Sequence, residues 1–131
     1  MFIMATVAVL APIGCSIGDD EDPKPASGTP AAIAAAVERL ERAVASEDFA
    51  TVCDELFTAE ARERSGGAEC EAQLRSASDG VRLPSIEVRG IHVAGDRARV
   101  GVTTRAAGQA RVRDELRMRR VDGRWRVEAL S

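Results

Sequence analysis

The spacing of apolar residues changes once along this 131-residue chain, and this change is the strongest constraint on its fold. Before residue 83, apolar side chains recur every three or four residues, as they do along one face of a helix. After residue 83, they alternate with polar side chains, as in a strand with one buried face. We therefore expect helices followed by an antiparallel sheet, which is an α+β domain.

The first part of the pattern predicts several short helices rather than one long one. Thr29 suits the N-cap of the first helix, and Thr58 suits the N-cap of a later one. Gly66 and Gly67 should end that later helix, because glycine adopts the backbone conformations found beyond helix ends. The expected helices span 31–46, 48–57, 59–64 and 68–76.

The second part predicts four strands joined by tight connections, that is, a bent meander. Gly95-Asp96 and Asp122-Gly123 are hairpin signals. In the first strand the alternation slips by one residue at Arg89-Gly90, which predicts a β-bulge there. We expect the helices to pack on one face of this sheet.

The predicted register raises a question about Asp114. If the loop at Gly108 has three residues, Thr104 pairs with Val112 and Val102 pairs with Asp114. Asp114 would then point to the apolar face, where burial raises the pKa of a carboxyl group and favours a role as a base. A second bulge at residues 113–115 would instead turn Asp114 outward, so both directions stay open.

The first 14 residues carry no charged side chain and end at Cys15. The run is too short to span a bilayer and has the length of a signal-peptide apolar region. It lacks the basic residues that usually precede such a region, which raises the hypothesis that translation starts upstream. Gly14-Cys15 resembles a bacterial lipoprotein processing site, in which the Cys receives lipid and becomes the N-terminus. Otherwise Cys15 is an ordinary buried or bridged cysteine.

The segment after Cys15 is polar, with four consecutive acids from Asp19 to Asp22 and three prolines up to Pro30. This composition is typical of a linker that cannot pack. We therefore divide the chain into a signal peptide (1–14), a lipid-anchored linker (15–30) and a folded domain (31–131). The expected location is the extracytoplasmic face of the cell membrane.

The cysteine count is odd, since the chain has three. If Cys15 carries lipid, Cys53 and Cys70 remain, each on the apolar side of a predicted helix. A disulfide between them would close a loop of fewer than 20 residues and stabilise the domain by about 3 kcal/mol. The alternative is two reduced cysteines in the core. We expect no metal site, because two cysteines and the distant His92 do not make a ligand set.

Charge is distributed unevenly along the chain. Residues 19–81 hold 15 acids and 6 bases, a net charge of −9, whereas residues 82–131 hold 6 acids and 12 arginines, a net charge of +6. The arginines on alternating strand positions predict a basic sheet face. It is either a solvated face or a contact surface for anionic lipid, a cell-wall polymer, a partner protein or a second copy of the chain. The expected face consists of Arg97, Arg99, Arg111, Arg113, Arg117, Arg119 and Arg126.

Four features together resemble the nuclear transport factor 2-like superfamily, a cone of bent sheet around helices, also described as cystatin-like. They are the leading helix, the stretch "AVASEDFATVCDEL", the hairpin "VAGDRARV" and the terminal "VDGRWRVEAL". The closest resemblance is to secreted actinobacterial lipoproteins of this superfamily, in which a cysteine pair like Cys53 and Cys70 recurs. The resemblance implies a cavity between sheet and helices. The superfamily includes isomerases and cyclases as well as non-catalytic binding modules, so the fold alone does not decide the function.

The remaining candidates favour binding over catalysis. His92 should face solvent, and Arg120 should lie across from Trp125 in a cation–π contact. Leu116, Met118, Trp125 and Val127 should be core residues rather than a ligand site. We expect no catalytic residue, metal or cofactor and no nucleic-acid partner. The leading hypothesis is a membrane-tethered, non-enzymatic module for an unknown ligand or protein. The alternative is a small cavity enzyme with Asp114 as base.

Overall fold

A computed structural model describes residues 28–131 of the chain. The predicted signal peptide, the lipidation site at Cys15 and nearly all of the predicted linker lie outside this range. The described part begins with α1 (Thr29–Ala45), followed by α2 (Phe49–Thr51), a π-helical turn η1 (Val52–Leu56) and α3 (Ala59–Arg64). A 3₁₀ turn η2 (Gly67–Glu69) and α4 (Cys70–Ala77) complete the helical part.

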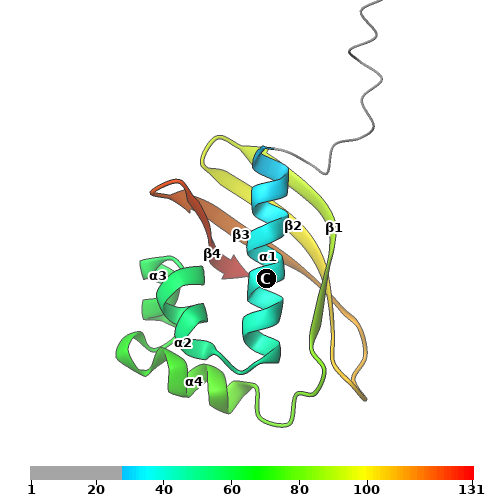
Figure 1. Cartoon of the computed structure of the whole chain (residues 1–131). Helices are drawn as coiled ribbons and strands as arrows, with labels where there is room; N and C mark the ends of the chain where they lie inside the picture. Colours follow the sequence, from blue (N-terminus) through cyan, green and yellow to red (C-terminus); the bar gives the residue numbers. More distant parts are fainter. Residues whose placement is uncertain (1–27) are drawn as a thin grey trace, which may run out of the picture.

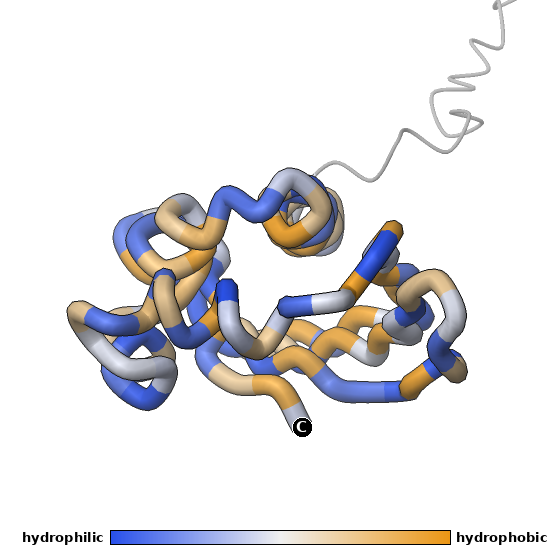
Figure 2. The backbone as a smooth tube through the Cα atoms, turned by 90° about the horizontal axis from the view of Figure 1, so that it is seen from below, coloured by the Kyte–Doolittle hydropathy of each residue, from blue (hydrophilic) through white to orange (hydrophobic). Residues whose placement is uncertain are grey.

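Four strands follow, β1 (Ser85–Ala94), β2 (Arg97–Arg105), β3 (Val112–Val121) and β4 (Arg124–Leu130). They pair antiparallel in the order β1-β2-β3-β4. All the helices cover one face of this bent sheet and leave the other face bare (Figures 1 and 2). The expected α+β architecture is therefore confirmed.

The core forms where α1 crosses the sheet. Ile33, Val37 and Leu40, which share one stripe of α1, are buried against β2 and β3. Val100 and Val102 meet them from the sheet and have no exposed surface. Each such side chain contributes about 1.5–3 kcal/mol when it is buried. A hydrogen bond of 2.6 Å from the Ile86 backbone N–H to the Glu41 carboxylate also ties α1 to β1.

The helix ends follow the expected chemistry, with one shift. The Thr58 hydroxyl accepts a hydrogen bond from the backbone N–H of Ala61 and caps α3, as predicted. Gly66, in the left-handed region, and Gly67 separate α3 from α4. The first helix begins at Thr29, so the N-cap is Gly28 and not Thr29. Gly28 has a φ of 94°, which only glycine adopts without strain.

The predicted second helix differs in kind from the expected one. After one α turn, the chain widens into the π turn η1, in which the Phe57 N–H donates to the Val52 carbonyl over 2.9 Å. Phe49, Val52, Cys53 and Leu56 are nevertheless buried as expected. After the turn the chain reaches the free edge of β4, where the Thr58 N–H donates to the Val127 carbonyl at 2.9 Å.

The register of the sheet agrees with the prediction at its two decisive points. The β1–β2 pairing shifts between Val88 and Gly90, which confirms the bulge, and Val102 pairs with Asp114. A second bulge, between Arg117 and Met118 in the β3–β4 pairing, was not predicted. It changes the phase of β4, so that Ala129, expected to point inward, pairs with Arg117.

A disulfide joins Cys53 of η1 to Cys70 of α4, 17 residues apart in the sequence. Both residues are buried. The bridge therefore fixes α4 to the turn that carries Phe49 and Val52, and α4 has few other core contacts because Cys70 is its only buried residue. The two reduced cysteines of the alternative interpretation are excluded.

We expect that replacing both Cys53 and Cys70 by serine lowers the free energy of unfolding by about 3 kcal/mol, because the open loop gains conformational entropy when the chain unfolds. Urea unfolding of the double variant and of the oxidised and reduced parent chain measures this difference. Cys15→Ser is the matched control and should leave the unfolding midpoint unchanged. An oxidised parent chain no more stable than the double variant contradicts the prediction.

Candidate functional site

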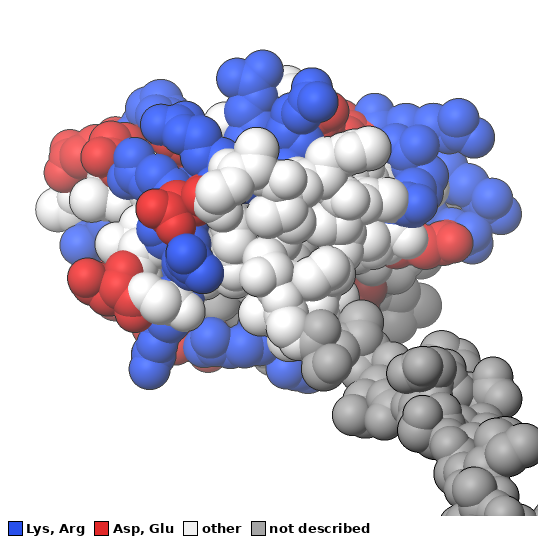
Figure 3. All heavy atoms as spheres, turned by 90° about the horizontal axis from the view of Figure 1, so that it is seen from above, with Lys and Arg blue, Asp and Glu red and all other residues white. Residues whose placement is uncertain are grey.

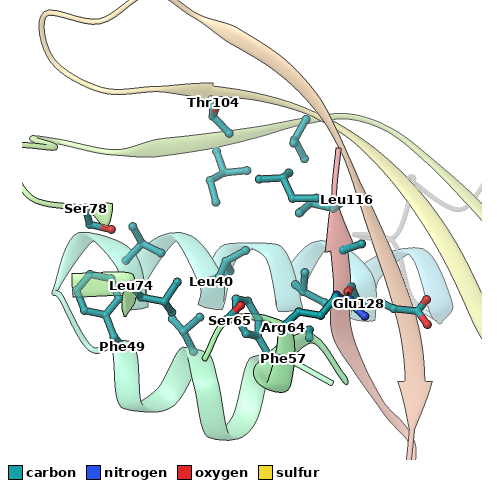
Figure 4. A pocket seen from close by; sticks show the side chains of 18 residues that line it. Leu40, Phe49, Phe57, Arg64, Ser65, Leu74, Ser78, Thr104, Leu116 and Glu128 are labelled. Atoms are coloured by element: carbon teal, nitrogen blue, oxygen red, sulfur yellow. Dashed lines mark hydrogen bonds between the residues drawn. The ribbon is translucent and has the colours of Figure 1, made fainter. Parts of the chain in front are cut away.

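A cavity of about 450 Å³ lies between the helices and the sheet. Leu40 and Val44 of α1 form one wall, and Val102 and Leu116 form the opposite wall. Figure 4 shows Phe49 and Leu74 at one end, near Ser78, and Phe57, Arg64, Ser65 and Glu128 toward the other. Its volume, and a wall formed by both helices and strands, are typical of a small-molecule pocket.

The cavity wall is mainly apolar, and its polar groups are few. Ser65 and Ser78 are two of the hydroxyls, and the third, that of Thr104, donates to the Val112 carbonyl at 3.4 Å. The two charged lining residues, Arg64 and Glu128, already have partners. The Arg64 guanidinium donates to the Glu128 carbonyl.

The Glu128 carboxylate also has partners, and they lie on the bare face of the sheet. It contacts Arg97 at 3.5 Å and Arg119 at 3.6 Å. Its side chain is only 21% exposed, which strengthens these ion pairs relative to fully solvated ones. Among the described lining residues, the Glu128 carboxylate is therefore neutralised by two arginines, whereas the Arg64 guanidinium is held by a backbone carbonyl.

Asp114 lies on the helix-facing side of the sheet, because it pairs with the buried Val102. The pairing runs from Thr104–Val112 to Arg97–Arg119 without a register shift, so no bulge turns Asp114 outward. Asp114 is half-buried, but it is not among the residues that line the cavity. Of the two directions left open by the sequence, the structure shows the inward one, and the cavity is built without the Asp114 carboxylate.

The other sequence candidates lie where the strand pattern places them. His92 is exposed. Arg120 pairs with Trp125, and its guanidinium lies 5.9 Å from the ring centroid while it also binds Asp96 at 2.8 Å. Leu116 and Val127 are core residues that also form part of the cavity wall, whereas Met118 and Trp125 are core residues outside it.

The expected arginine face divides into two groups. Arg97, Arg119 and Arg126 contact neighbouring groups: Arg97 and Arg119 bind Glu128, Arg119 binds Glu60 at 2.8 Å, and Arg126 donates to the carbonyls of Asp54 and Phe57. Arg119 and Arg126 join the sheet to the helical segment, whereas Arg97 joins β2 to β4. Within residues 28–131, no ion pair is formed by Arg99, Arg111, Arg113 or Arg117.

Sequence reasoning missed the helix-borne part of the site. Arg64, Ser65 and Ser78 follow no periodic pattern, because they lie at helix ends whose direction depends on η1 and the disulfide. The pairing of Glu128 with two arginines depends on the β3–β4 bulge. The "VDGRWRVEAL" stretch holds the only acid of β4, which is the one available signal.

Among residues 28–131, no group of three or more His, Cys, Asp or Glu side chains is arranged to hold a metal ion. In the same range, none of the helices combines the length and the apolar character needed to cross a membrane.

Solved structures with a similar fold include an NTF-2 like protein of unknown function from Silicibacter pomeroyi, 23% identical, with a TM-score of 0.58 over 77% of this chain and 91% of that one. The chain has the nuclear transport factor 2-like (NTF2-like) fold. Another NTF2-like protein of unknown function, from Shewanella baltica, is 13% identical, with a TM-score of 0.53 over 76% and 87% of the two chains.

A SEC-C motif containing protein from Rhodopseudomonas palustris is also similar in structure, 20% identical, with a TM-score of 0.60 over 74% of this chain and 75% of that one. No protein-family model and no curated protein sequence matches the chain. At these identities the comparisons establish the fold, and the function must be argued from the site.

Protonation of Glu60 should affect the stability of this NTF2-like domain. Its pKa is lowered, first by a hydrogen bond from its own backbone N–H and further by the positive charge of Arg119, although desolvation opposes both. Because the folded-state pKa is lowered, the stabilisation is present above the unfolded-state pKa of about 4.5 and is lost as the pH falls through the folded-state value.

We therefore expect Glu60→Gln to reduce the loss of stability between about pH 6 and pH 3. Urea unfolding of parent and variant across this range provides the measurement. Glu63→Gln, on the same helix, is the control and should follow the parent curve. Parallel curves for parent and Glu60→Gln would contradict the assignment.

Proposed function

We propose that this chain is a lipid-anchored extracytoplasmic protein of the NTF2-like superfamily, of the secreted actinobacterial lipoprotein type. Its domain binds an uncharged, largely apolar small molecule and is not an enzyme. The observation that carries the binding proposal is the 450 Å³ cavity, whose walls are mainly apolar and whose one carboxylate in the described residues is neutralised by two arginines. The NTF2-like neighbours, themselves of unknown function, support the fold in which this cavity lies.

The preference for an uncharged ligand follows from electrostatics. A charged ligand would lose its hydration on entering a mainly apolar cavity, which is costly. A neutral molecule would bury apolar surface at no such cost, and the Ser65, Ser78 and Thr104 side chains offer hydroxyl groups to a carbonyl or hydroxyl of the ligand.

The chemistry of the wall supports binding rather than catalysis. General acid–base catalysis requires a titratable group within hydrogen-bond reach of the reacting atom. In the described residues, the cavity wall carries neither histidine nor free thiol, and its one carboxylate binds Arg97 and Arg119. Asp114, the base of the enzymatic alternative, lies outside the wall.

The anchoring proposal rests on the sequence at Gly14-Cys15, on the uncharged run before it and on the acidic, proline-containing segment after it. The disulfide gives independent support, since disulfides persist in oxidising compartments outside the cytoplasm. It also uses the other two cysteines of the chain, so that Cys15 is the one that remains for lipid modification.

Blocking the cavity should abolish ligand binding. We expect the neutral fluorescent probe N-phenyl-1-naphthylamine to bind the parent chain with a dissociation constant of about micromolar order, and Val44→Trp to weaken binding at least about tenfold. The charged probe 8-anilinonaphthalene-1-sulfonate should bind much less well. Probe fluorescence titrations measure both constants.

Ala45→Trp is the matched control, because Ala45 is the next residue on α1, is exposed and does not line the cavity. It should bind the probe as the parent does. Leu74→Trp, from a different wall, gives a second blocked cavity should Val44→Trp unfold. If Val44→Trp and Leu74→Trp both fold and bind the probe as the parent does, the cavity is not the binding site. Absence of probe binding by the parent chain would refute the proposal as well.

Lipid anchoring should depend on Cys15 alone. We expect the chain produced in a bacterium that processes lipoproteins to fractionate with membranes and to carry a diacyl or triacyl adduct at an N-terminal Cys15, and Cys15→Ser to lose both properties. Fractionation and intact mass measure this outcome, with Ser16→Ala as control. An unmodified soluble parent chain would disprove the anchor.

A further inference from the structure

The bare face of the sheet carries two adjacent rows of basic residues that differ in their partners. In one row, Arg97, Arg119 and Arg126 pair across β2, β3 and β4. Glu60 and Glu128 neutralise Arg97 and Arg119, and Arg126 donates to backbone carbonyls. Arg97 and Arg119 are therefore neutralised within the molecule, whereas Arg126 keeps a buried Nε without a hydrogen-bond partner in the described residues.

The second row consists of His92, Arg99 and Arg117, and we call it the open row. His92 pairs with Arg99, and Arg99 pairs with Arg117, so the three residues lie side by side across β1, β2 and β3. All three are exposed, and no ion pair within residues 28–131 involves them. Like charges directly opposite each other in a sheet are destabilising. An external anion would remove that repulsion.

The open row also borders a hollow in the surface. His92, Arg99 and Arg117 line it together with Arg97 and Glu128, and its volume is about 480 Å³. Glu128 is already bound by two arginines, so the net charge around the hollow is positive. The Arg99 and Arg117 guanidinium groups have the planar, multiply donating geometry that suits phosphate oxygens.

The position of the open row relative to the chain's point of entry identifies the partner. The β1–β2 hairpin lies at the same end of the molecule as the first turn of α1, where residues 1–27 join the domain (Figure 1). Residues 29–37 of α1 carry no charged side chain, and Val93 and Ala94 of the hairpin are exposed. Seen from this end, the centre of the surface is uncharged and basic side chains surround much of it (Figure 3).

We infer that this end of the domain, through the open row, binds the phosphate groups of an anionic membrane surface. The inference rests on the proposed anchoring at Cys15, which would hold the domain near that surface. A chain of residues 16–28 spans at most about 45 Å when fully extended, which is ample for the row to reach the headgroups. An uncharged patch with a basic border is the pattern by which proteins lie on anionic bilayers.

A second copy of the chain fits the open row less well. The helical half of the domain carries the acids that a copy would offer, but several of them are already paired. Glu55 binds Arg39 at 2.9 Å, Asp54 binds Arg62 at 3.4 Å, and Glu60 binds Arg119 at 2.8 Å. The phosphate groups of an anionic bilayer can bind the open row without breaking any such ion pair.

The test uses the full chain carrying Cys15→Ser, so that no lipid contributes to binding. We expect it to float with vesicles containing phosphatidylglycerol and not with vesicles of phosphatidylcholine alone, and to be released as the salt concentration rises. Arg99→Glu/Arg117→Glu in the same background should weaken binding to the anionic vesicles at least about tenfold. Circular dichroism and the unfolding midpoint verify that the variant is folded.

The matched control is Arg82→Glu/Arg105→Glu, an equal change of charge at exposed residues at the other end of the sheet. It should bind within about twofold of the parent. If both double variants lost the same amount of vesicle binding, overall charge and not the open row would explain the binding. If the chain bound neutral vesicles, the apolar N-terminal run would explain it. Either result overturns the inference.

Two further outcomes would assign the open row to another partner. In the first outcome, the chain does not bind vesicles, but inorganic phosphate shifts the NMR signals of Arg99 and Arg117. The open row would then be an ion site only. A dimer in solution that Arg99→Glu/Arg117→Glu dissociates would assign it to a second copy. Because these assays use unlipidated protein, they can disprove membrane binding by the open row without affecting the proposed lipid anchor at Cys15. Equally, the lipid anchor can be disproved while binding by the open row is confirmed.

Discussion

Contact between α1 and the sheet organises the whole domain. The stripe of Ile33, Val37 and Leu40 is buried only because β2 presents small, tightly packed side chains opposite it, among them Val100 and Val102. The bent sheet curves around this helix (Figures 1 and 2). The bulge at Gly90 supplies part of that curvature, since an extra residue in one strand bends the ribbon and increases its twist.

The cavity is a consequence of how the remaining helices are held. α1 fills one part of the curved sheet, and the segment from Phe49 to Ala77 covers another. This second segment is braced internally by the Cys53–Cys70 bridge, and it meets the sheet through the buried Val52 and Leu56 and through the hydrogen bond from Thr58 to β4. Space remains between Leu74, Phe49 and the strands, and a ligand could use it.

Much of the fold could be predicted from the sequence, since it depends on local periodicity. The change of period, the Gly90 bulge, the Thr58 cap and the pairing of Val102 with Asp114 all follow from side-chain spacing and turn residues. The β3–β4 bulge and the π turn could not be predicted, because no glycine or break in spacing marks them. The candidate site proved harder still: Arg64 and Ser78 reach the cavity through tertiary packing, and Glu128 finds Arg97 and Arg119 only across three strands.

The two edges of the sheet are closed in different ways, and this bears on how the protein behaves at high concentration. The edge of β4 is occupied by the chain at Phe57 and Thr58, which pairs with Val127. Within residues 28–131, the edge of β1 is not paired with another strand. However, the Glu41 carboxylate accepts a hydrogen bond from the Ile86 N–H, and the bulge at Gly90 interrupts the regular row of donors and acceptors. An irregular, partly occupied edge is a poor template for strand addition. The same bulge that shapes the sheet around α1 thereby protects the domain from edge-to-edge aggregation.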